Sequence, residues 1–393
     1  MKYDFTTLID RHHVGSSKYE LMMAQNPDLE DNIIPYSVAD MEFKTPPEIV
    51  EALKKVLDEQ ILGYTRATPE YLEAVRNWMK KRHDWEIRDE WIVCTPGVVN
   101  ALYAAVRAYT EVGDGVIIMP PVYHPFFSAV ELSKRTLVTN PLLNKAGRYE
   151  IDFEDLEMKA SDPRNKVLLF CSPHNPVGRV WTEKELEKVA EICLRNNVLM
   201  VSDEIHFDLI MPKHTHTVLA KLDGVLDHVI VCTAPSKTFN LAGMQTSNII
   251  IPNNELRNAF KEELASVAIF DLNALGYKAC ETAYNACEPW LDEVIEVIFE
   301  NHRILMAHME KHHPDIIVSP LEGTYLQWMD FSSLGRERKA LEKLLQDEAK
   351  VYLNMGFIFG IEGEGFVRMN IACPTRIMKE GLERLSDAID QLK

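Results

Sequence analysis

A lysine, an aspartate and an asparagine in this sequence each follow a short apolar segment. Lys237 lies in TAPSKTF after one such segment, Asp203 ends VLMVSD, and Asn175 lies in SPHNPVG after VLLFC. The carboxyl ends of neighbouring parallel strands meet at one edge of a sheet, so we expect these side chains to converge. An amine, a carboxylate and an amide in one cleft are the groups that pyridoxal 5'-phosphate (PLP) requires.

Each of the three residues has a distinct use in that chemistry. The amine of Lys237 can form a Schiff base with the aldehyde of PLP. Asp203 can keep the pyridine nitrogen protonated, so that the ring accepts electrons from a carbanion, and the amide of Asn175 can donate to the ring oxygen. A lysine at a strand end is commonly a surface residue, so the prediction depends on the three residues together.

The elements that must position these residues alternate along the middle of the chain. A helix is predicted over 45–59, with Thr45 as N-cap and Pro46 as its first residue, and a capping box of Thr182 and Glu185 begins another helix. Strands that are apolar throughout and separated by helices indicate an α/β fold with a mostly parallel sheet covered on both faces. The predicted strands are 116–119, 167–171, 198–201 and 228–232.

The pattern changes beyond about residue 285. A long helix is predicted over about 289–313, a second helical stretch over 336–351 and a strand over 366–372. This order favours a separate, smaller α+β domain built from the C-terminal third.

Composition excludes several classes of function. The 393 residues include 42 Lys and Arg against 60 Asp and Glu, a net charge of −18 that disfavours nucleic acid and anionic membrane surfaces as partners. The first residues lack the apolar core of a signal peptide, and no uncharged apolar run is long enough to span a bilayer. The seven dispersed cysteines form no CxxC pair, which predicts reduced thiols in a cytoplasmic protein.

Other motifs support no competing site. The glycine-rich segment 360–365 does not follow a strand and open a helix, as a dinucleotide-binding loop must. No metal site is expected, because three histidine pairs lack the spacing of zinc ligands and are predicted to be solvated. These pairs are His12/His13, His214/His216 and His312/His313.

Taken in order, the motifs NPVG, SDE and SKTFN resemble those of the fold type I PLP-dependent enzymes, the class I/II aminotransferase group. Asn175 and Asp203 are 28 residues apart, and Asp203 and Lys237 are 34 apart. Further segments are similar to the cystathionine β-lyase or carbon–sulfur lyase branch: VADMEFKTPPE, GYT, TPGVVNAL, PPVYHPF, DEIHFDL, APSKTFNLAG and EGTYLQW. The resemblance implies a PLP-dependent transferase-like fold, with a large domain over 45–285 and a small domain of 1–44 with 286–393.

The same resemblance implies roles for individual residues. Lys237 would be the Schiff-base lysine and then the general base at Cα. Asp203 would pair with the pyridinium nitrogen, Asn175 with the ring oxygen and the substrate, and Tyr123 would stack on the ring. Arg368, in FVRMN, would grip the α-carboxylate of a small amino-acid substrate in a two-pronged contact.

Further residues are implied at the phosphate end of the cofactor. Gly97, Val98 and Val99 would offer backbone N–H groups where a helix begins, a suitable place for an anion. Ser236 would be a further donor. Tyr64, in GYTR, matches a tyrosine that reaches the phosphate across the interface of a homodimer.

Two positions depart from the pattern of many aminotransferases. Gln245 stands where they have an arginine that neutralises the phosphate, and His206 stands where they have a tyrosine beside the cofactor. Both departures fit the lyase branch better than aspartate-type aminotransferases.

The resemblance therefore implies a PLP-dependent carbon–sulfur β-lyase that cleaves L-cystathionine or related cysteine S-conjugates to a thiol, pyruvate and ammonia. Transamination is the alternative, because it shares the steps up to proton removal from Cα. A third hypothesis is a regulatory protein that binds a transcription regulator through the surface of the same fold.

Overall fold

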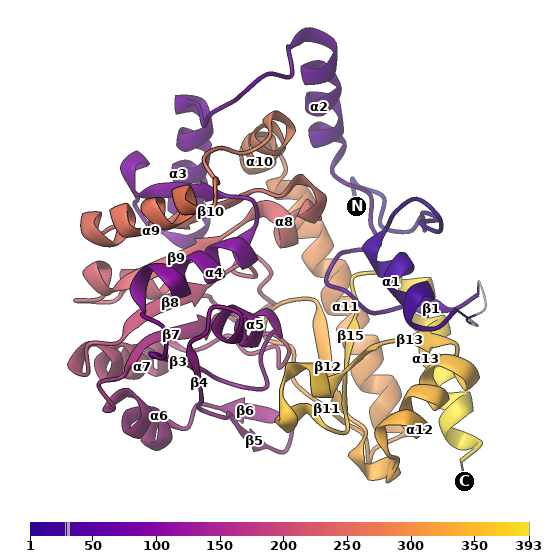
Figure 1. The fold of residues 1–393 in the computed structure, drawn as a ribbon. Helices are drawn as coiled ribbons and strands as arrows, with labels where there is room; N and C mark the ends of the chain where they lie inside the picture. Colours follow the sequence, from indigo (N-terminus) through magenta and orange to yellow (C-terminus); the bar gives the residue numbers. More distant parts are fainter. Residues whose placement is uncertain (28, 30–31, 393) are drawn as a thin grey trace.

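The computed structural model describes residues 1–27, 29 and 32–392, and a seven-stranded sheet forms its centre (Figure 1). In spatial order its strands are β2 (Ile92–Thr95), β10 (Ser247–Ile250), β9 (Val229–Thr233), β8 (Leu199–Asp203), β7 (Asn165–Cys171), β3 (Gly115–Ile118) and β4 (Thr136–Thr139). Strand β10 is antiparallel to both of its neighbours, and the pairs from β9 through β4 are parallel. The predicted α/β class with a mostly parallel sheet is confirmed.

Helices cover both faces of this sheet, as the apolar strands predict. In β7, Val167 and Leu169 join one buried cluster, whereas Leu168 and Phe170 join the other, because successive side chains of a strand point to opposite faces. The first cluster is completed by α4 (Val98–Tyr109), α5 (Pro125–Glu131) and α9 (Asn254–Ser266). The second includes residues of α3 (Pro69–His83), α6 (Phe153–Ala160), α7 (Glu183–Arg195) and α10 (Ala274–Ala286).

A second, antiparallel sheet lies in the C-terminal third. Its strands, in spatial order, are β11 (Ile317–Val318), β12 (Leu326–Asp330), β15 (Phe366–Asn370) and β14 (Asn354–Met355). Beside it lie α11 (Glu288–His312) and α13 (Thr375–Asp390). A separate hairpin joins β5 (Leu143–Lys145) to β6 (Arg148–Glu150).

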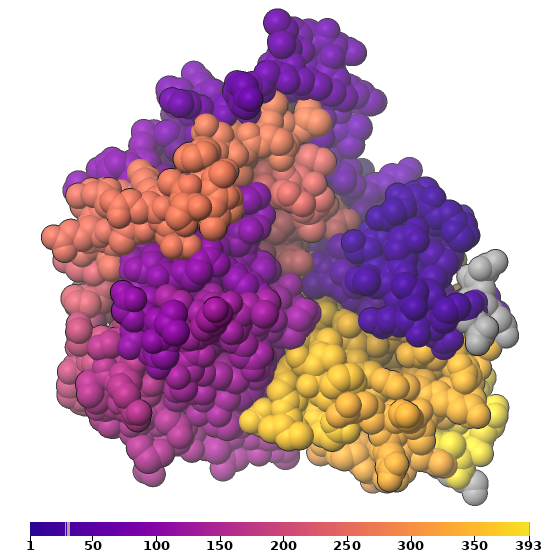
Figure 2. All heavy atoms as spheres, viewed as in Figure 1, coloured from indigo at the N-terminus to yellow at the C-terminus, as the bar shows by residue number. Residues whose placement is uncertain are grey.

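The N-terminal segment packs on this C-terminal third. Strand β1 (Ile34–Pro35) pairs with β13 (Val351–Tyr352), and α1 (Ser17–Gln25) lies beside them. Figure 2 shows the indigo N-terminal residues seated against the yellow C-terminal ones. The exact division into domains at residues 44/45 and 285/286 stays a prediction.

Several predicted boundaries are corrected by the structure. Helix α2 is Pro47–Glu59 with Pro46 at the N-cap, so Thr45 does not cap it, because Pro47 takes the first helical position where a missing N–H costs nothing. The stretch 336–351 contains α12 (Arg338–Lys343) followed by a π-helical turn rather than one helix. The capping box of Thr182 and Glu185 is confirmed.

Two histidines predicted to be solvated are buried. His216 lies with Nε2 2.7 Å from Glu204 Oε2, and His313 lies with Nε2 2.9 Å from Ser386 Oγ. Polar neighbours brought from elsewhere in the fold satisfy these imidazoles, which local sequence does not reveal. Within the described ranges, no cluster of three or more His, Cys, Asp or Glu side chains could hold a metal ion. No described helix has the length and apolar character that crossing a membrane requires.

Candidate active site

The three central residues of the sequence prediction meet at the carboxyl edge of the sheet. Asp203 is the last residue of β8, Asn175 follows the end of β7 by four residues, and Lys237 follows the end of β9 by four. They line one pocket of about 220 Å³. The other predicted residues that line it are Gly97, Val98, Val99, Tyr123, His206 and Ser236.

Lys237 lies in the short helix α8 (Pro235–Thr238), which starts immediately after β9 and Ala234. Its Nζ donates a hydrogen bond to the Ala39 carbonyl at 2.8 Å. Burial lowers the pKa of Lys237 to about 8, although Asp40 acts to raise it. A substantial fraction of the side chain is therefore a neutral amine at mildly alkaline pH, and this is the form that attacks an aldehyde.

Asp203 is buried and forms no ion pair with a cation of the described residues, although the charge of Lys237 acts to lower its pKa. The side chain is 3% exposed, and its Oδ1 accepts a hydrogen bond from the Ile205 N–H at 3.2 Å. Burial raises the pKa of Asp203 to about 7. A protonated pyridine nitrogen would supply the positive charge that this carboxylate needs, so the residues present fit PLP.

Arg368, on β15 of the second sheet, contacts Asn175 in the wall of this pocket. Its guanidinium donates to Asn175 Oδ1 at 3.0 Å and to Asn354 Oδ1 at 2.7 Å, while its buried Nε has no partner among the described residues. Burial lowers the pKa of Arg368 to about 10, so it remains a cation at neutral pH. A buried cation held by amide oxygens is suited to receive the carboxylate of an amino acid.

The start of α4 forms the candidate phosphate end of the pocket. Gly97 has a φ of +101°, which favours glycine, and a Cβ added there would meet nothing within 4 Å. Its N–H donates to the Thr95 carbonyl at 2.7 Å, and its predicted role as a phosphate donor stays a prediction. Val98 and Val99 begin α4, where backbone N–H groups lack intrahelical partners and favour an anion.

Tyr123 and His206 complete the wall around the candidate cofactor position. The Tyr123 N–H donates to the Asn175 carbonyl at 3.1 Å, and burial raises the pKa of its hydroxyl. His206 is buried, its Nδ1 has no partner in the described part of the chain, and burial holds its pKa well below the ordinary value. His206 is thus a neutral imidazole with an unused nitrogen in the pocket wall.

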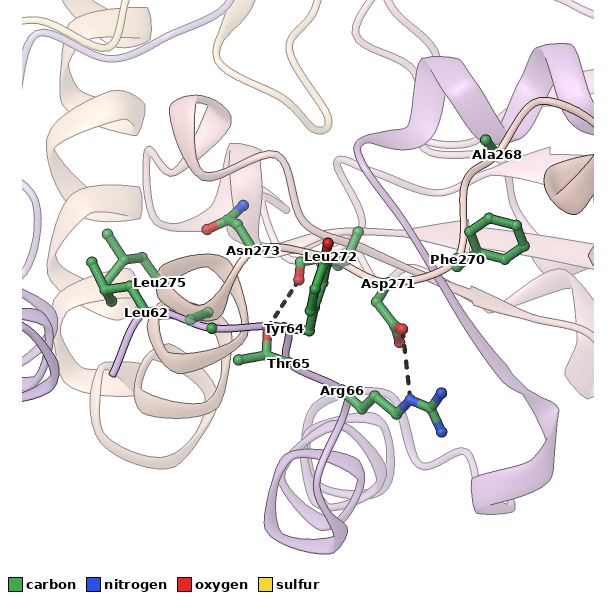
Figure 3. Close-up of a pocket in the computed structure, with 12 residues that line it drawn as sticks. Leu62, Tyr64, Thr65, Arg66, Ala268, Phe270, Asp271, Leu272, Asn273 and Leu275 are labelled. Carbon is green, nitrogen blue, oxygen red and sulfur yellow. Dashed lines mark hydrogen bonds and ion pairs between the residues drawn. The ribbon is translucent and has the colours of Figure 1, made fainter. Parts of the chain in front are cut away.

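Tyr64 lines a different and larger pocket of about 940 Å³, formed by residues 62–66, 268 and 270–275 (Figure 3). Its side chain is fully exposed, whereas Thr65 Oγ1 beside it donates to the Leu272 carbonyl at 3.1 Å. The structure does not bring Tyr64 to Lys237 within this chain, so its predicted role across an interface stays a prediction.

Sequence reasoning missed several residues around Lys237 and Arg368. Ala39 and Tyr325 lie in segments that resemble the lyase branch, VADMEF and EGTYLQW, yet neither residue was assigned a role. Tyr325 donates its hydroxyl to the Ala39 carbonyl at 2.8 Å. Asn354 carries no signal in the sequence, because its contact with Arg368 arises from the pairing of β14 with β15.

Comparison with known proteins decides the family. Residues 31–385 match the family model described as Aminotransferase class I and II. The chain belongs to this family.

Several proteins of the lyase branch are similar to this chain over almost its whole length. Cystathionine beta-lyase PatB of Bacillus subtilis is 44% identical over 357 residues, which are 91% of this chain and 92% of that protein. The crystal structure of cystalysin from Treponema denticola, which contains a PLP cofactor, has 50% identity and a TM-score of 0.98, with full coverage of both chains. The PLP-bound C-S lyase of Staphylococcus hominis has 34% identity and a TM-score of 0.93, covering 99% of this chain and 98% of that one.

Proposed function

We propose that this protein is a PLP-dependent carbon–sulfur β-lyase that cleaves L-cystathionine or related cysteine S-conjugates to a thiol, pyruvate and ammonia. The observation that carries the proposal is that Lys237, Asp203 and Asn175 line one pocket. Arg368 donates a hydrogen bond to Asn175 in its wall. Similarity over nearly the full chain to a cystathionine beta-lyase and to C-S lyases supports the same reaction.

Bound PLP supplies an aldehyde and a protonated ring that accepts the electron pair released when the Cα–H bond breaks. Arg368, with Asn175 beside it, would bind the α-carboxylate and so fix the orientation of the substrate in the pocket. Lys237 takes the Cα proton as a neutral amine, which its pKa of about 8 permits. A protonated ring nitrogen beside Asp203 would offset the effect of burial on this carboxyl, and the resulting carboxylate would favour the protonated ring.

Elimination then requires the Cβ–S bond to break with its electron pair leaving on sulfur as a thiolate. Water hydrolyses the remaining three-carbon fragment to pyruvate and ammonia. Transamination is the second candidate, because the family that the chain matches is described as aminotransferases, which exchange an amino group rather than expel a leaving group.

The assembly is proposed as a homodimer in which Tyr64 of one subunit faces the phosphate end of the other subunit's pocket. The fully exposed Tyr64 and the exposed Leu62 and Phe270 nearby support this arrangement. We propose a cytoplasmic location, because the cysteines are free thiols that are mostly buried.

The first experiment tests the site and the reaction together. Purified protein with added PLP should show the visible absorbance of PLP bound to a lysine; Lys237→Ala should lose it, and Lys54→Ala, at an exposed lysine, should keep it. L-cystathionine should then give thiol and pyruvate in equal amounts. Normal PLP absorbance with a keto acid but no thiol would refute the lyase and favour transamination.

A further inference from the structure

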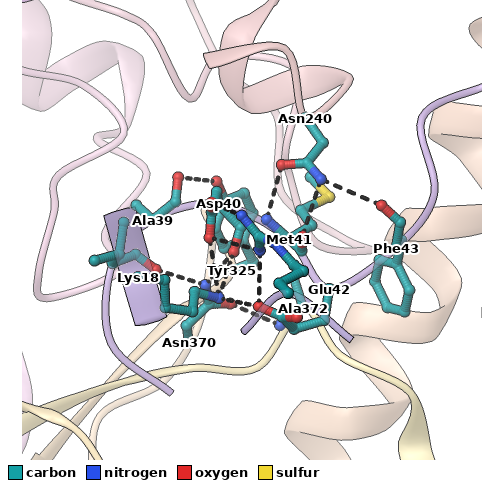
Figure 4. A network of polar contacts seen from close by, with 12 residues as sticks. Lys18, Ala39, Asp40, Met41, Glu42, Phe43, Asn240, Tyr325, Asn370 and Ala372 are labelled. Atoms are coloured by element: carbon teal, nitrogen blue, oxygen red, sulfur yellow. Dashed lines mark hydrogen bonds and ion pairs between the residues drawn. The ribbon is translucent and has the colours of Figure 1, made fainter. Parts of the chain in front are cut away.

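Residues 38–43, here called the strap, are irregular backbone that is fixed by side chains from both halves of the site (Figure 4). On one side the strap is held by Asn240, three residues after Lys237. Asn240 Oδ1 accepts from the Met41 N–H at 2.9 Å, and its Nδ2 donates to the carbonyls of Met41 and Phe43 at 2.9 and 3.2 Å. The strap and the segment that carries Lys237 are therefore joined.

On the other side the strap is held by residues next to Arg368. Asn370 donates to the carbonyls of Val38 and Asp40, both at 2.7 Å. The Val38 N–H donates to Asn354 Oδ1 at 3.1 Å, and the same oxygen accepts from Arg368. The strap thus links the lysine that reacts with PLP to the arginine that receives the substrate.

The strap presents one acceptor to the catalytic lysine. The Ala39 carbonyl accepts from Lys237 Nζ and from the Tyr325 hydroxyl, each at 2.8 Å. Lys237 would hold PLP, and substrate binding would release its amine. The Ala39 carbonyl, which accepts from this amine in the ligand-free chain, would then be the acceptor available to hold it.

A cluster of four charges, in which Lys18 and Glu42 are buried and Arg11 and Asp40 are half-buried, holds the strap in place. Lys18 of α1 is 1% exposed, and its Nζ lies 2.6 Å from Glu42 Oε1, 3.1 Å from Asp40 Oδ1 and 2.9 Å from the Asp40 carbonyl. Arg11 binds the same two carboxylates at 2.6 and 3.0 Å. Burial raises the pKa of Asp40, but the charges of Lys18 and Arg11 outweigh burial and hold this pKa below its usual value.

We propose that Lys18 is a positioning residue of the active site, which holds the strap so that the Ala39 carbonyl receives the amine of Lys237 when substrate displaces it. The inference rests on the PLP chemistry proposed above. It gives the N-terminal segment a defined part in the reaction, although the hydrogen bonds and ion pairs of Lys18 within the described residues go to Asp40 and Glu42 and not to the pocket wall.

The charges of the cluster distinguish this role from simple packing. Burial has the largest effect on the pKa of Lys237 and lowers it. The negative charges of Asp40 and Asp203 act to raise this pKa, whereas the positive charges of Arg368 and Lys18 act to lower it. Lys18→Met should therefore raise the pKa of the Lys237 nitrogen, and Asp40→Asn should lower it. A loosened strap without an electrostatic role would move this pKa in the same direction in both variants.

The test is the pH dependence of PLP uptake by the PLP-free protein, followed by its visible absorbance, because the rate of uptake reports the proton on the free Lys237 amine. We expect the midpoint to move up by about half a pH unit in Lys18→Met and down by a similar amount in Asp40→Asn. Lys18→Arg retains the charge and should keep the wild-type midpoint. Lys54→Met, which breaks an exposed pair with Glu51, is the matched control.

Shifts of the same sign in both variants, or unchanged midpoints, would overturn the proposal. If Lys18→Met does not fold, a lower midpoint in Asp40→Asn together with a wild-type midpoint in Lys18→Arg still supports the proposed role of Lys18. Any other pair of midpoints refutes this role. This measurement needs no turnover. The expected shifts without thiol release would thus refute the proposed lyase function and leave the role of Lys18 standing.

Discussion

The replacement Asp203→Asn should stabilise the PLP-free protein at alkaline pH. Asp203 is buried, and burial raises its pKa from 3.8 to about 7. The folded state therefore binds a proton that the unfolded chain has already lost between about pH 4 and pH 7. Within this window the free energy of unfolding of the wild type falls as the pH rises, and above pH 7 the loss is complete.

The size of the effect follows from the shift. A rise of about three pH units corresponds to about 4 kcal/mol, of which about 3 kcal/mol falls between pH 5 and pH 8. The asparagine has no proton to lose, so the difference in unfolding free energy between Asp203→Asn and the wild type should change by about 3 kcal/mol between these two pH values. The variant should gain stability relative to the wild type as the pH rises.

Urea unfolding of the PLP-free proteins at pH 5 and pH 8 measures this difference directly. Asp58→Asn, which alters an exposed carboxylate on α2, is the control and should show no such change. Added PLP should stabilise the wild type more than Asp203→Asn at pH 8, because the ring nitrogen supplies the missing positive charge. A difference that is the same at both pH values would refute the electrostatic argument for Asp203.

Three further predictions concern single parts of the site. Arg368→Lys should raise KM for the amino-acid substrate by about 100-fold, or about 3 kcal/mol, because lysine cannot make the two-pronged contact. Steady-state kinetics of a variant with unchanged PLP absorbance would check this. Mixing inactive Tyr64→Ala with inactive Lys237→Ala should recover about a quarter of wild-type activity through hybrid dimers, whereas no recovery would contradict a site shared between subunits. The rate of PLP uptake by the PLP-free protein should rise with pH and level off above about 8, as expected for Lys237; a rise that continues to 10.5 would contradict the effect of burial.

The part of the site that could be predicted from the sequence is the part that depends on local order. Asp203 ends an apolar strand, and Asn175 and Lys237 each follow one by four residues. Parallel strands bring such positions to one edge of the sheet, independently of the rest of the fold. The capping box of Thr182 likewise depends on four consecutive residues, and the structure contains it. Family resemblance extended the prediction to Arg368 and to the pocket wall.

The remaining features depend on contacts between distant segments. The Ala39 carbonyl meets Lys237 across 198 residues of chain, and a backbone carbonyl has no signature in a sequence. His216 lies in a polar stretch that looks exposed, and only its approach to Glu204 explains its burial. At α2 two consecutive prolines both suit a helix start, so the sequence alone did not distinguish Pro46 from Pro47 as the first helical residue.

The central claim is that this chain eliminates a thiolate instead of exchanging an amino group. The most direct measurement is the amount of pyruvate and thiol formed per PLP-loaded subunit from excess L-cystathionine, without any added keto acid. A β-lyase regenerates its cofactor at each turnover, so both products should appear in equal amounts and exceed the enzyme many times over. Formation of a keto acid that stops at about one equivalent per subunit, with no thiol, would contradict the account.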